Sequence, residues 1–227
     1  MTHPATCNKP GNKPRPNPGK DQIPQPDISN TNLVYEIGSN LYINLTDRCT
    51  LTFQFCPKHN GCTEVKGYQL ALTERPEIER IIELIGDPSR YDSVVFCGYG
   101  EPTLRLKALL EIAHWIKDHG GNTRLNTDGL GNLVNKRNIL PELSECIDAL
   151  SISMNAQNPE VYEQHCVPTL PGSFEAMLEF IELAPRYIDD VSASAINGLP
   201  GVDTEACRQM AEARQVKFRQ RELDVVG

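Results

Sequence analysis

The sequence predicts an α/β fold, and more closely a partial (β/α)6 barrel of the TIM type. Short β-like runs alternate with amphipathic segments from residue 41 to the end, which indicates a parallel sheet with right-handed crossovers. In the run Leu150–Asn155, apolar residues alternate with two serines and an asparagine. We expect the apolar side chains to face the helices and the polar ones to line the interior, which favours a barrel over an open sheet.

Each strand of the predicted sheet is a short apolar or alternating run bounded by turn residues. The first follows a turn at Gly38–Asn40, and the fourth is the alternating run described above. The six predicted strands are Leu41–Thr46, Val94–Cys97, Thr123–Thr127, Leu150–Asn155, Val191–Ile196 and Val216–Leu223.

The segments between the strands carry apolar residues at helical spacing. Isoleucines at positions 78, 81, 82 and 85 form one face of a helix that ends at Gly86 and Pro88. The later helices are predicted at Leu106–Ala113, Pro141–Cys146, Phe174–Ile181 and Asp203–Gln215.

Composition bounds the function. The chain has 227 residues and a formal net charge of −8, which argues against binding to nucleic acid or membrane through bulk electrostatics. We find no apolar signal region and no run long enough to span a membrane, so we expect a cytoplasmic protein. In a reducing compartment its eight cysteines are more often metal ligands or buried thiols than disulfides.

Residues 1–30 contain seven prolines and no aromatic residue, which predicts a disordered tail ahead of one folded domain at 31–227. Little in such a tail can contribute to a core. A variant that starts at residue 31 should therefore unfold at nearly the same temperature as the full chain in a thermal melt. A large loss of stability would contradict this prediction.

The segment after the first strand has the form of an iron–sulfur cysteine loop. Cys49 and Cys56 stand where the outer thiols of a C-x3-C-x2-C loop would stand, but Phe53 occupies the middle place. Three thiolates anchor three irons of a cubane cluster and leave the fourth open to another ligand. Phenylalanine has no lone pair for iron, so we expect any 4Fe–4S cluster here to be labile or lost unless another residue replaces the missing thiolate.

Two nearby residues are candidate substitutes. His59 and Cys62 give the spacing Cys56-x2-His59-x2-Cys62, and together with Cys49 they form a Cys3His set suited to zinc. A solvated loop around Gly61 explains the same residues without a metal.

Four motifs, each at the end of a successive predicted strand, resemble the radical S-adenosylmethionine (SAM) superfamily, and most closely the TatD-associated radical SAM proteins. The resemblance covers about residues 33–227. The motifs are Asn44-Leu-Thr-Asp-Arg-Cys49, Cys97-Gly-Tyr-Gly-Glu-Pro-Thr-Leu104, Arg124-Leu-Asn-Thr-Asp-Gly-Leu-Gly-Asn132 and Ser151-Ile-Ser-Met-Asn-Ala156.

The resemblance implies a chemistry and a set of roles. A 4Fe–4S cluster reduces SAM, which splits into methionine and a 5′-deoxyadenosyl radical that abstracts hydrogen from a substrate. The implied metal ligands are Cys49 and Cys56, with Cys62 as the leading substitute. An electron donor such as flavodoxin or ferredoxin is implied as a partner, with a functional link to a TatD-type nuclease. The implied cofactor-binding residues are Phe55, Gly98, Gly100, Glu101, Asn126, Asp128, Ser153 and Asn155.

Their roles follow the family's motifs. Phe55 packs near the adenine, Gly100 lets the backbone approach the methionyl amino group, and Glu101 holds that group. Asn126 and Asp128 are candidates for the ribose and carboxylate, as are the serine and asparagine at 153 and 155. Taken alone, Gly-Glu-Pro after a strand is also a turn with a helix-initiating proline.

Two other interpretations remain open. The chain could be a degenerate barrel that binds SAM, another nucleotide or a protein without cleaving SAM. It could also be a structural zinc protein.

Overall fold

A computed structural model describes residues 32–54, 56, 58, 61 and 63–223. The predicted N-terminal tail lies outside these residues, as do Phe55, His59 and Cys62. Within them, no helix is long and apolar enough to cross a membrane.

The main sheet has seven strands in the order β1-β2-β5-β6-β7-β8-β9. β1 (Val34–Ile37) pairs antiparallel with β2 (Asn40–Ile43), and every later neighbour is parallel. The six parallel strands are those predicted, so the α/β barrel-type fold is confirmed. The remaining strands are β5 (Ser93–Phe96), β6 (Thr123–Thr127), β7 (Ala149–Ser153), β8 (Asp190–Asn197) and β9 (Lys217–Glu222).

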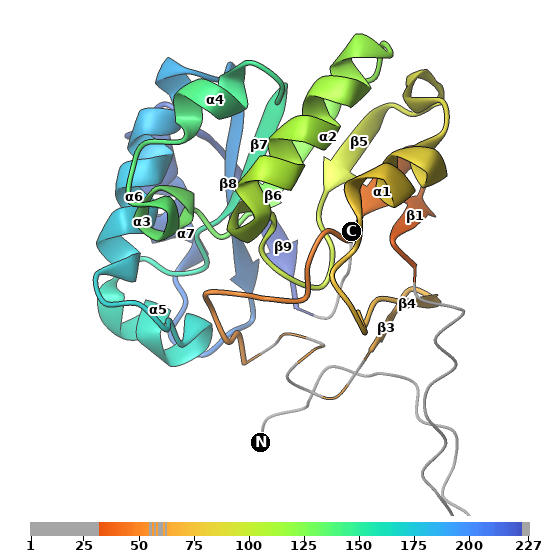
Figure 1. The fold of residues 1–227 in the computed structure, drawn as a ribbon. Helices are drawn as coiled ribbons and strands as arrows, with labels where there is room; N and C mark the ends of the chain where they lie inside the picture. The colour runs from red at the N-terminus through yellow and green to blue at the C-terminus, as the bar shows by residue number, and fades with distance from the viewer. Residues whose placement is uncertain (1–31, 55, 57, 59–60, 62, 224–227) are drawn as a thin grey trace, which may run out of the picture.

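Helices cover one face of this sheet (Figure 1). Their buried residues form one core with the outward side chains of the strands, such as Leu125, Leu150 and Ile152. The helices are α1 (Ile78–Ile85), α2 (Leu106–Asp118), α3 (Gly131–Asn135), α4 (Leu140–Ser144), α5 (Pro159–Cys166), α6 (Ser173–Leu183) and α7 (Thr204–Glu212), with short 3-10 turns at Pro88–Arg90, Pro102–Arg105 and Ala184–Arg186.

Two features escaped the sequence analysis. The segment before the predicted turn is itself a strand, β1, and a small hairpin joins β3 (Glu64–Val65) to β4 (Tyr68–Gln69). Both lie where the apolar pattern is too short to distinguish a strand from a loop.

The second face of the sheet carries a smaller aromatic cluster and then polar residues. Tyr35, Tyr42, Leu70 and Val95 pack together there, and the rings of Tyr35 and Tyr42 stack with centroids 5.4 Å apart. Along β7 the burial alternates, with apolar residues in the helix-side core and serines only half-buried. This is the alternation that the sequence predicted.

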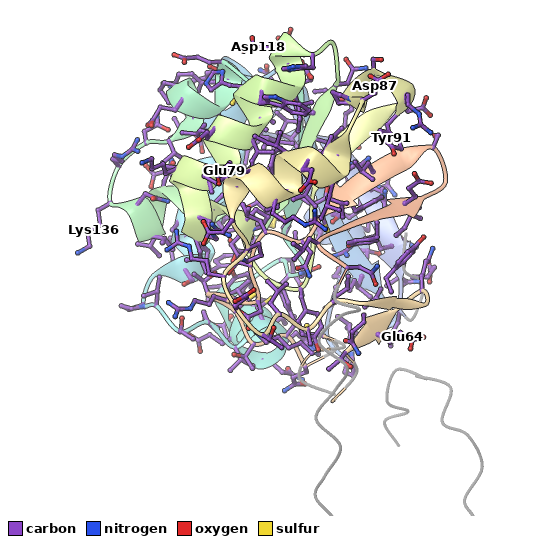
Figure 2. The ribbon with its side chains drawn as sticks, turned by 45° about the vertical axis from the view of Figure 1, so that its right-hand side comes forward. Glu64, Glu79, Asp87, Tyr91, Asp118 and Lys136 are labelled. Carbon is purple, nitrogen blue, oxygen red and sulfur yellow. The ribbon has the colours of Figure 1, made fainter. Side chains whose placement is uncertain are left out.

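The two ends of the sheet differ. Figure 2 shows Asp87 and Asp118, which follow α1 and end α2, at one end of the molecule and Glu64 of the hairpin at the other. The strands run toward the end marked by Glu64, so the loops that carry the four motifs gather there.

Candidate functional site

The loops that follow β2 and β5 pack tightly together, and glycines make this possible. A Cβ added at Gly98 would lie 2.4 Å from Oδ1 of Asn44, and one at Gly100 would lie 2.4 Å from the Arg48 carbonyl oxygen and 2.6 Å from that of Thr46. The backbone N–H of Glu101 donates to the Arg48 carbonyl at 2.8 Å. In this structure the space left by the missing side chains is filled by the loop that leads to Cys49.

Gly100→Ala should therefore destabilise the protein by about 3 kcal/mol or more, because its Cβ would meet backbone atoms that cannot rotate away. Gly38→Ala is the matched control. Gly38 has a φ of +62° but no atom within 4 Å of an added Cβ, so only backbone strain of about 1 kcal/mol is expected. Thermal melts of both variants test this, and an equal loss of stability would contradict the packing argument.

Asn44 opens the first motif, but the sequence predicted no role for its side chain. It is fully buried at the end of β2. Its Nδ2 donates to the Leu70 carbonyl at 2.8 Å and its Oδ1 accepts from the backbone N–H of Tyr99 at 3.0 Å. One amide thus joins the cysteine loop, the segment after the hairpin and the glycine loop. The sequence pattern that could have pointed to this role is an asparagine directly after a short apolar strand.

Glu101 and Asp128 form a buried carboxylate pair. Oε1 of Glu101 accepts from the Thr103 N–H at 3.0 Å, the Thr103 hydroxyl at 2.7 Å and the Thr127 hydroxyl at 2.8 Å. Its Oε2 accepts from the backbone N–H of Asp128 at 2.8 Å. The side chain of Asp128 in turn accepts from the Thr50 hydroxyl and the Leu130 N–H.

This environment shifts both pKa values upward. Burial, followed by the charge of Asp128, raises the pKa of Glu101 to about 8, although hydrogen bonds from Thr103 and Asp128 oppose the rise. Burial likewise raises the pKa of Asp128. Two carboxylates in one buried site repel each other when both are ionised. The pair therefore tends to keep one proton near neutral pH.

Glu101 also begins the 3-10 turn Pro102–Arg105 by capping the Thr103 N–H. The turn-forming role suggested by the Gly-Glu-Pro sequence is thus present. A carboxylate has about four lone-pair positions, and Oε2 accepts one hydrogen bond from the described residues, so it keeps acceptor capacity for a further donor. Contact of Glu101 with a SAM amino group stays a prediction.

Cys49 and Cys56 are both half-buried free thiols, close enough for Cys56 to affect the pKa of Cys49. Burial raises the pKa of Cys49 to about 12, and the negative charges of Glu101, Asp128 and Cys56 add to the rise, while Lys58 opposes it. A metal that binds Cys49 must therefore displace a proton. A cavity of about 730 Å³ opens beside Cys49, lined also by Lys58 and Arg105 but not by Asn126 or Asn155.

Phe53 is a packing residue in this structure. Its half-buried ring packs against the main hydrophobic core. The chain around it is fixed to the end of α5. The Thr52 and Gln54 N–H groups donate to the Cys166 and His165 carbonyls at 2.9 and 3.1 Å.

A residue of β6 and a residue just after β7 each contribute a buried side-chain atom without a hydrogen bond among the described residues. Oδ1 of Asn126 and Nδ2 of Asn155 have no partner among the described residues. Asn155 adopts a φ of +58°, and its Oδ1 accepts from the Arg221 guanidinium at 3.0 Å. Ser153, two residues before it, is half-buried at the end of β7. A buried acceptor and a buried donor without partners fit a polar ligand.

The residues present fit the two cofactors unequally. The unpartnered amide atoms suit hydroxyl and amino groups such as those of SAM. For a cluster, the described residues offer two neighbouring thiols, and no group of three His, Cys, Asp or Glu side chains among them could hold a metal. The predicted third ligand, Cys62, and the predicted adenine contact, Phe55, lie outside the described residues. The described donor set is thus one thiolate short of a full cluster site.

One family model, described as "Radical SAM superfamily", matches residues 43–213. The match begins at the end of β2 and ends just after α7, so it includes all four motif loops. No curated protein matches the chain by sequence.

Several solved structures share the fold. TYW1 with a bound lysine–pyruvate adduct aligns with a TM-score of 0.57 and 17% identity over 81% of this chain and 64% of that one. SuiB of Streptococcus suis bound to S-adenosylmethionine aligns with a TM-score of 0.60 and 14% identity, over 83% of this chain and 41% of SuiB. A radical SAM methyltransferase from Sphaerobacter thermophilus aligns with a TM-score of 0.55 and 12% identity, over 83% of this chain and 68% of the methyltransferase. The chain thus spans less than two thirds of TYW1 and SuiB.

Proposed function

The chain belongs to the radical SAM superfamily, and we propose on this basis that it binds SAM at the carboxyl ends of its strands. With a 4Fe–4S cluster assembled on the cysteine loop, it would use SAM to start hydrogen abstraction from a substrate. The cluster supplies the electron for this chemistry, while the chain's own residues bind and orient SAM and keep water away.

One observation carries the SAM site. Asn126 lies near the end of β6 and Asn155 follows the adjacent strand β7, and each holds a buried amide atom that has no partner among the described residues. Leaving a buried amide atom unpaired costs about 1–3 kcal/mol, which a ligand would recover. The buried Glu101–Asp128 pair supports the floor of the same site through the loops that carry both residues.

Finer parts of the proposal rest on the motifs. We assign the chain to the TatD-associated branch, with a flavodoxin- or ferredoxin-like electron donor and a functional link to a TatD-type nuclease. The six described cysteines are all free thiols, which supports a reducing compartment such as the cytoplasm.

A second candidate function is a degenerate barrel that binds SAM, another nucleotide or a protein without cleaving SAM. The packing of Phe53 against the core favours it, because the position that would supply the middle thiolate serves stability instead. The zinc alternative has no comparable support, since no three-ligand group exists among the described residues.

Calorimetric titration with SAM tests the binding site that both SAM-based functions share. SAM should bind the anaerobically reconstituted protein, and Asn126→Ala should weaken binding several-fold by removing an acceptor. Asn122→Ala is the control, because this exposed residue precedes β6 at the opposite end of the strand. Absence of SAM binding, or an equal effect of both substitutions, would count against the proposed site.

A further inference from the structure

The cavity beside Cys49 has no role in the proposed function. Its volume of about 730 Å³ lies within the range of about 300–1,000 Å³ that is typical of small-molecule sites. It is lined by the loop after β2 at 45–49, by the segment before α1 at 72–76, and by Lys58, Leu104 and Arg105. Of the described residues assigned above to SAM or the cluster, only Cys49 lines it. The cavity therefore lies beside the proposed SAM site, not within it.

Arg105 joins two walls of the cavity. Its Nη1 donates to the Leu45 carbonyl at 2.9 Å and to the Pro76 carbonyl at 2.8 Å. These two hydrogen bonds restrict the orientation of the half-buried guanidinium. A ligand would meet a cation that is already held in place, so binding costs less side-chain entropy than binding to a freely rotating arginine.

One donor of this guanidinium is unused. Nε of Arg105 is buried and makes no hydrogen bond among the described residues. An unpaired buried donor is unfavourable, and a bound oxygen acceptor would relieve that cost. Burial lowers the pKa of Arg105, and the positive charge of Arg75 lowers it further, while Glu77 opposes the change. Both effects favour an anion next to Arg105.

Positive side chains outnumber negative ones around the cavity. The positively charged residues that line it are Arg48, Lys58, Arg75 and Arg105, and the negatively charged ones are Asp47 and Glu74. None of the four cations has a carboxylate oxygen within 4.0 Å in the part of the chain that the structure describes. Because the whole chain carries a formal net charge of −8, this positive excess is local to the cavity.

Apolar side chains line the same cavity. Leu45 and Pro76 are buried there, and Leu72 and Leu104 are half-buried. A ligand with an apolar part can remove that part from water against these side chains. The lining therefore suits a molecule that is anionic at one end and apolar at the other.

We propose that this cavity binds a small organic anion that carries a phosphate or carboxylate group on an apolar body. Arg105 binds the anionic group through charge-assisted hydrogen bonds, and the exposed Arg48 and Arg75 add their charges. The leucines contact the apolar body. This inference goes beyond the proposed function, because binding here needs neither SAM nor a cluster.

Phenyl phosphate and benzoate are the probes for the test, each titrated calorimetrically into the full chain at constant ionic strength. At least one of them should bind, and the tighter of the two identifies the anionic group. Inorganic phosphate and acetate lack the ring, so each should bind about threefold or more weakly than its aromatic counterpart. The proposal is wrong if neither aromatic anion binds at millimolar concentration, or if the ring adds no affinity.

Substitutions then locate the bound anion. Arg105→Gln should weaken binding of the tighter probe about tenfold, and Arg75→Gln about threefold. Arg80→Gln is the matched control, because it removes the same charge from an exposed arginine of α1 that pairs with Glu83 and does not line the cavity. Equal weakening by Arg80→Gln would show that only net charge matters, and would overturn the proposal.

Thermal melts separate binding from stability. Arg105→Gln removes two hydrogen bonds to backbone carbonyls, so it should also lower the melting temperature. Arg75 forms no hydrogen bond or ion pair with the described residues, so Arg75→Gln should melt with the unaltered protein. This variant decides the matter even if Arg105→Gln does not fold. Unchanged affinity in Arg75→Gln and in any folded Arg105→Gln would make the arginines structural and overturn the proposal.

A competition titration distinguishes this cavity from the SAM site. The aromatic anion should bind with the same affinity in the presence and absence of SAM. Competition would place both ligands in one site and would overturn the separate cavity. Anion binding by a protein that fails to bind SAM would count against the proposed function and leave this inference standing.

Discussion

Phe53→Cys should raise the iron that the protein holds after anaerobic reconstitution to about four atoms per chain, from a substoichiometric amount in the unaltered protein. The substitution places a third thiol in register with Cys49 and Cys56, which completes the set that anchors a cubane cluster. Iron and sulfide analysis, with the visible absorption of the cluster, measures the effect.

Gln54→Cys is the matched control, since it adds a thiol one residue out of register. Equal iron in the two variants would show that any added cysteine suffices and would contradict the spacing argument. We also expect Phe53→Cys to cost about 1–3 kcal/mol of stability in a chemical denaturation, because a half-buried ring leaves the core. More bound iron together with lower stability would show that residue 53 can either supply a cluster ligand or pack against the core, but not both.

Glu101→Ala should destabilise the protein by about 3 kcal/mol in chemical denaturation, because it leaves four buried or half-buried donors without their acceptor. It should also weaken SAM binding several-fold if the carboxylate contacts the SAM amino group. If the folded variant binds SAM as tightly as the unaltered protein, Glu101 does not contact SAM and serves only to stabilise the turn at Pro102–Arg105.

The same carboxylate pair predicts a pH dependence. The folded pKa of Glu101, about 8, lies above its usual value of 4.5, so the folded state binds more protons than the unfolded state between these values. Stability is therefore greatest below about pH 5 as far as this group is concerned, and it falls as the pH rises to 8, by roughly 3 kcal/mol.

Asp128→Asn removes the neighbouring charge that helps to raise this pKa, so the fall in stability between pH 5 and pH 8 should shrink. Asp118→Asn, at an exposed residue that ends α2, is the control. Thermal melts across this pH range measure both variants. An identical pH slope in Asp128→Asn and the unaltered protein would show that the two carboxylates do not interact.

The parallel strands were predictable because their signals are local. The alternation of Leu150, Ser151, Ile152 and Ser153 reports which face of β7 packs on helices, and this needs no knowledge of the partners. The strand β1 and the hairpin β3–β4 were missed because their apolar runs are only two to four residues long.

The candidate site was predictable only in outline. The motif loops lie at one end of the sheet, as expected from parallel strands. What the sequence could not reveal is which way a side chain turns. The Glu101 carboxylate points inward to Thr103, Thr127 and the Asp128 N–H, and the space at Gly100 is filled by the Arg48 segment.

We propose that this radical SAM barrel retains a SAM site and that position 53 decides whether SAM is cleaved. Formation of 5′-deoxyadenosine tests it most directly, measured after anaerobic reconstitution with iron, sulfide, SAM and a strong reductant. The unaltered protein should form little or none, and Phe53→Cys should form it even without a substrate. Cleavage by the unaltered protein at the rate of Phe53→Cys would contradict the claim, and Cys62→Ala would then identify whether Cys62 supplies the third thiolate.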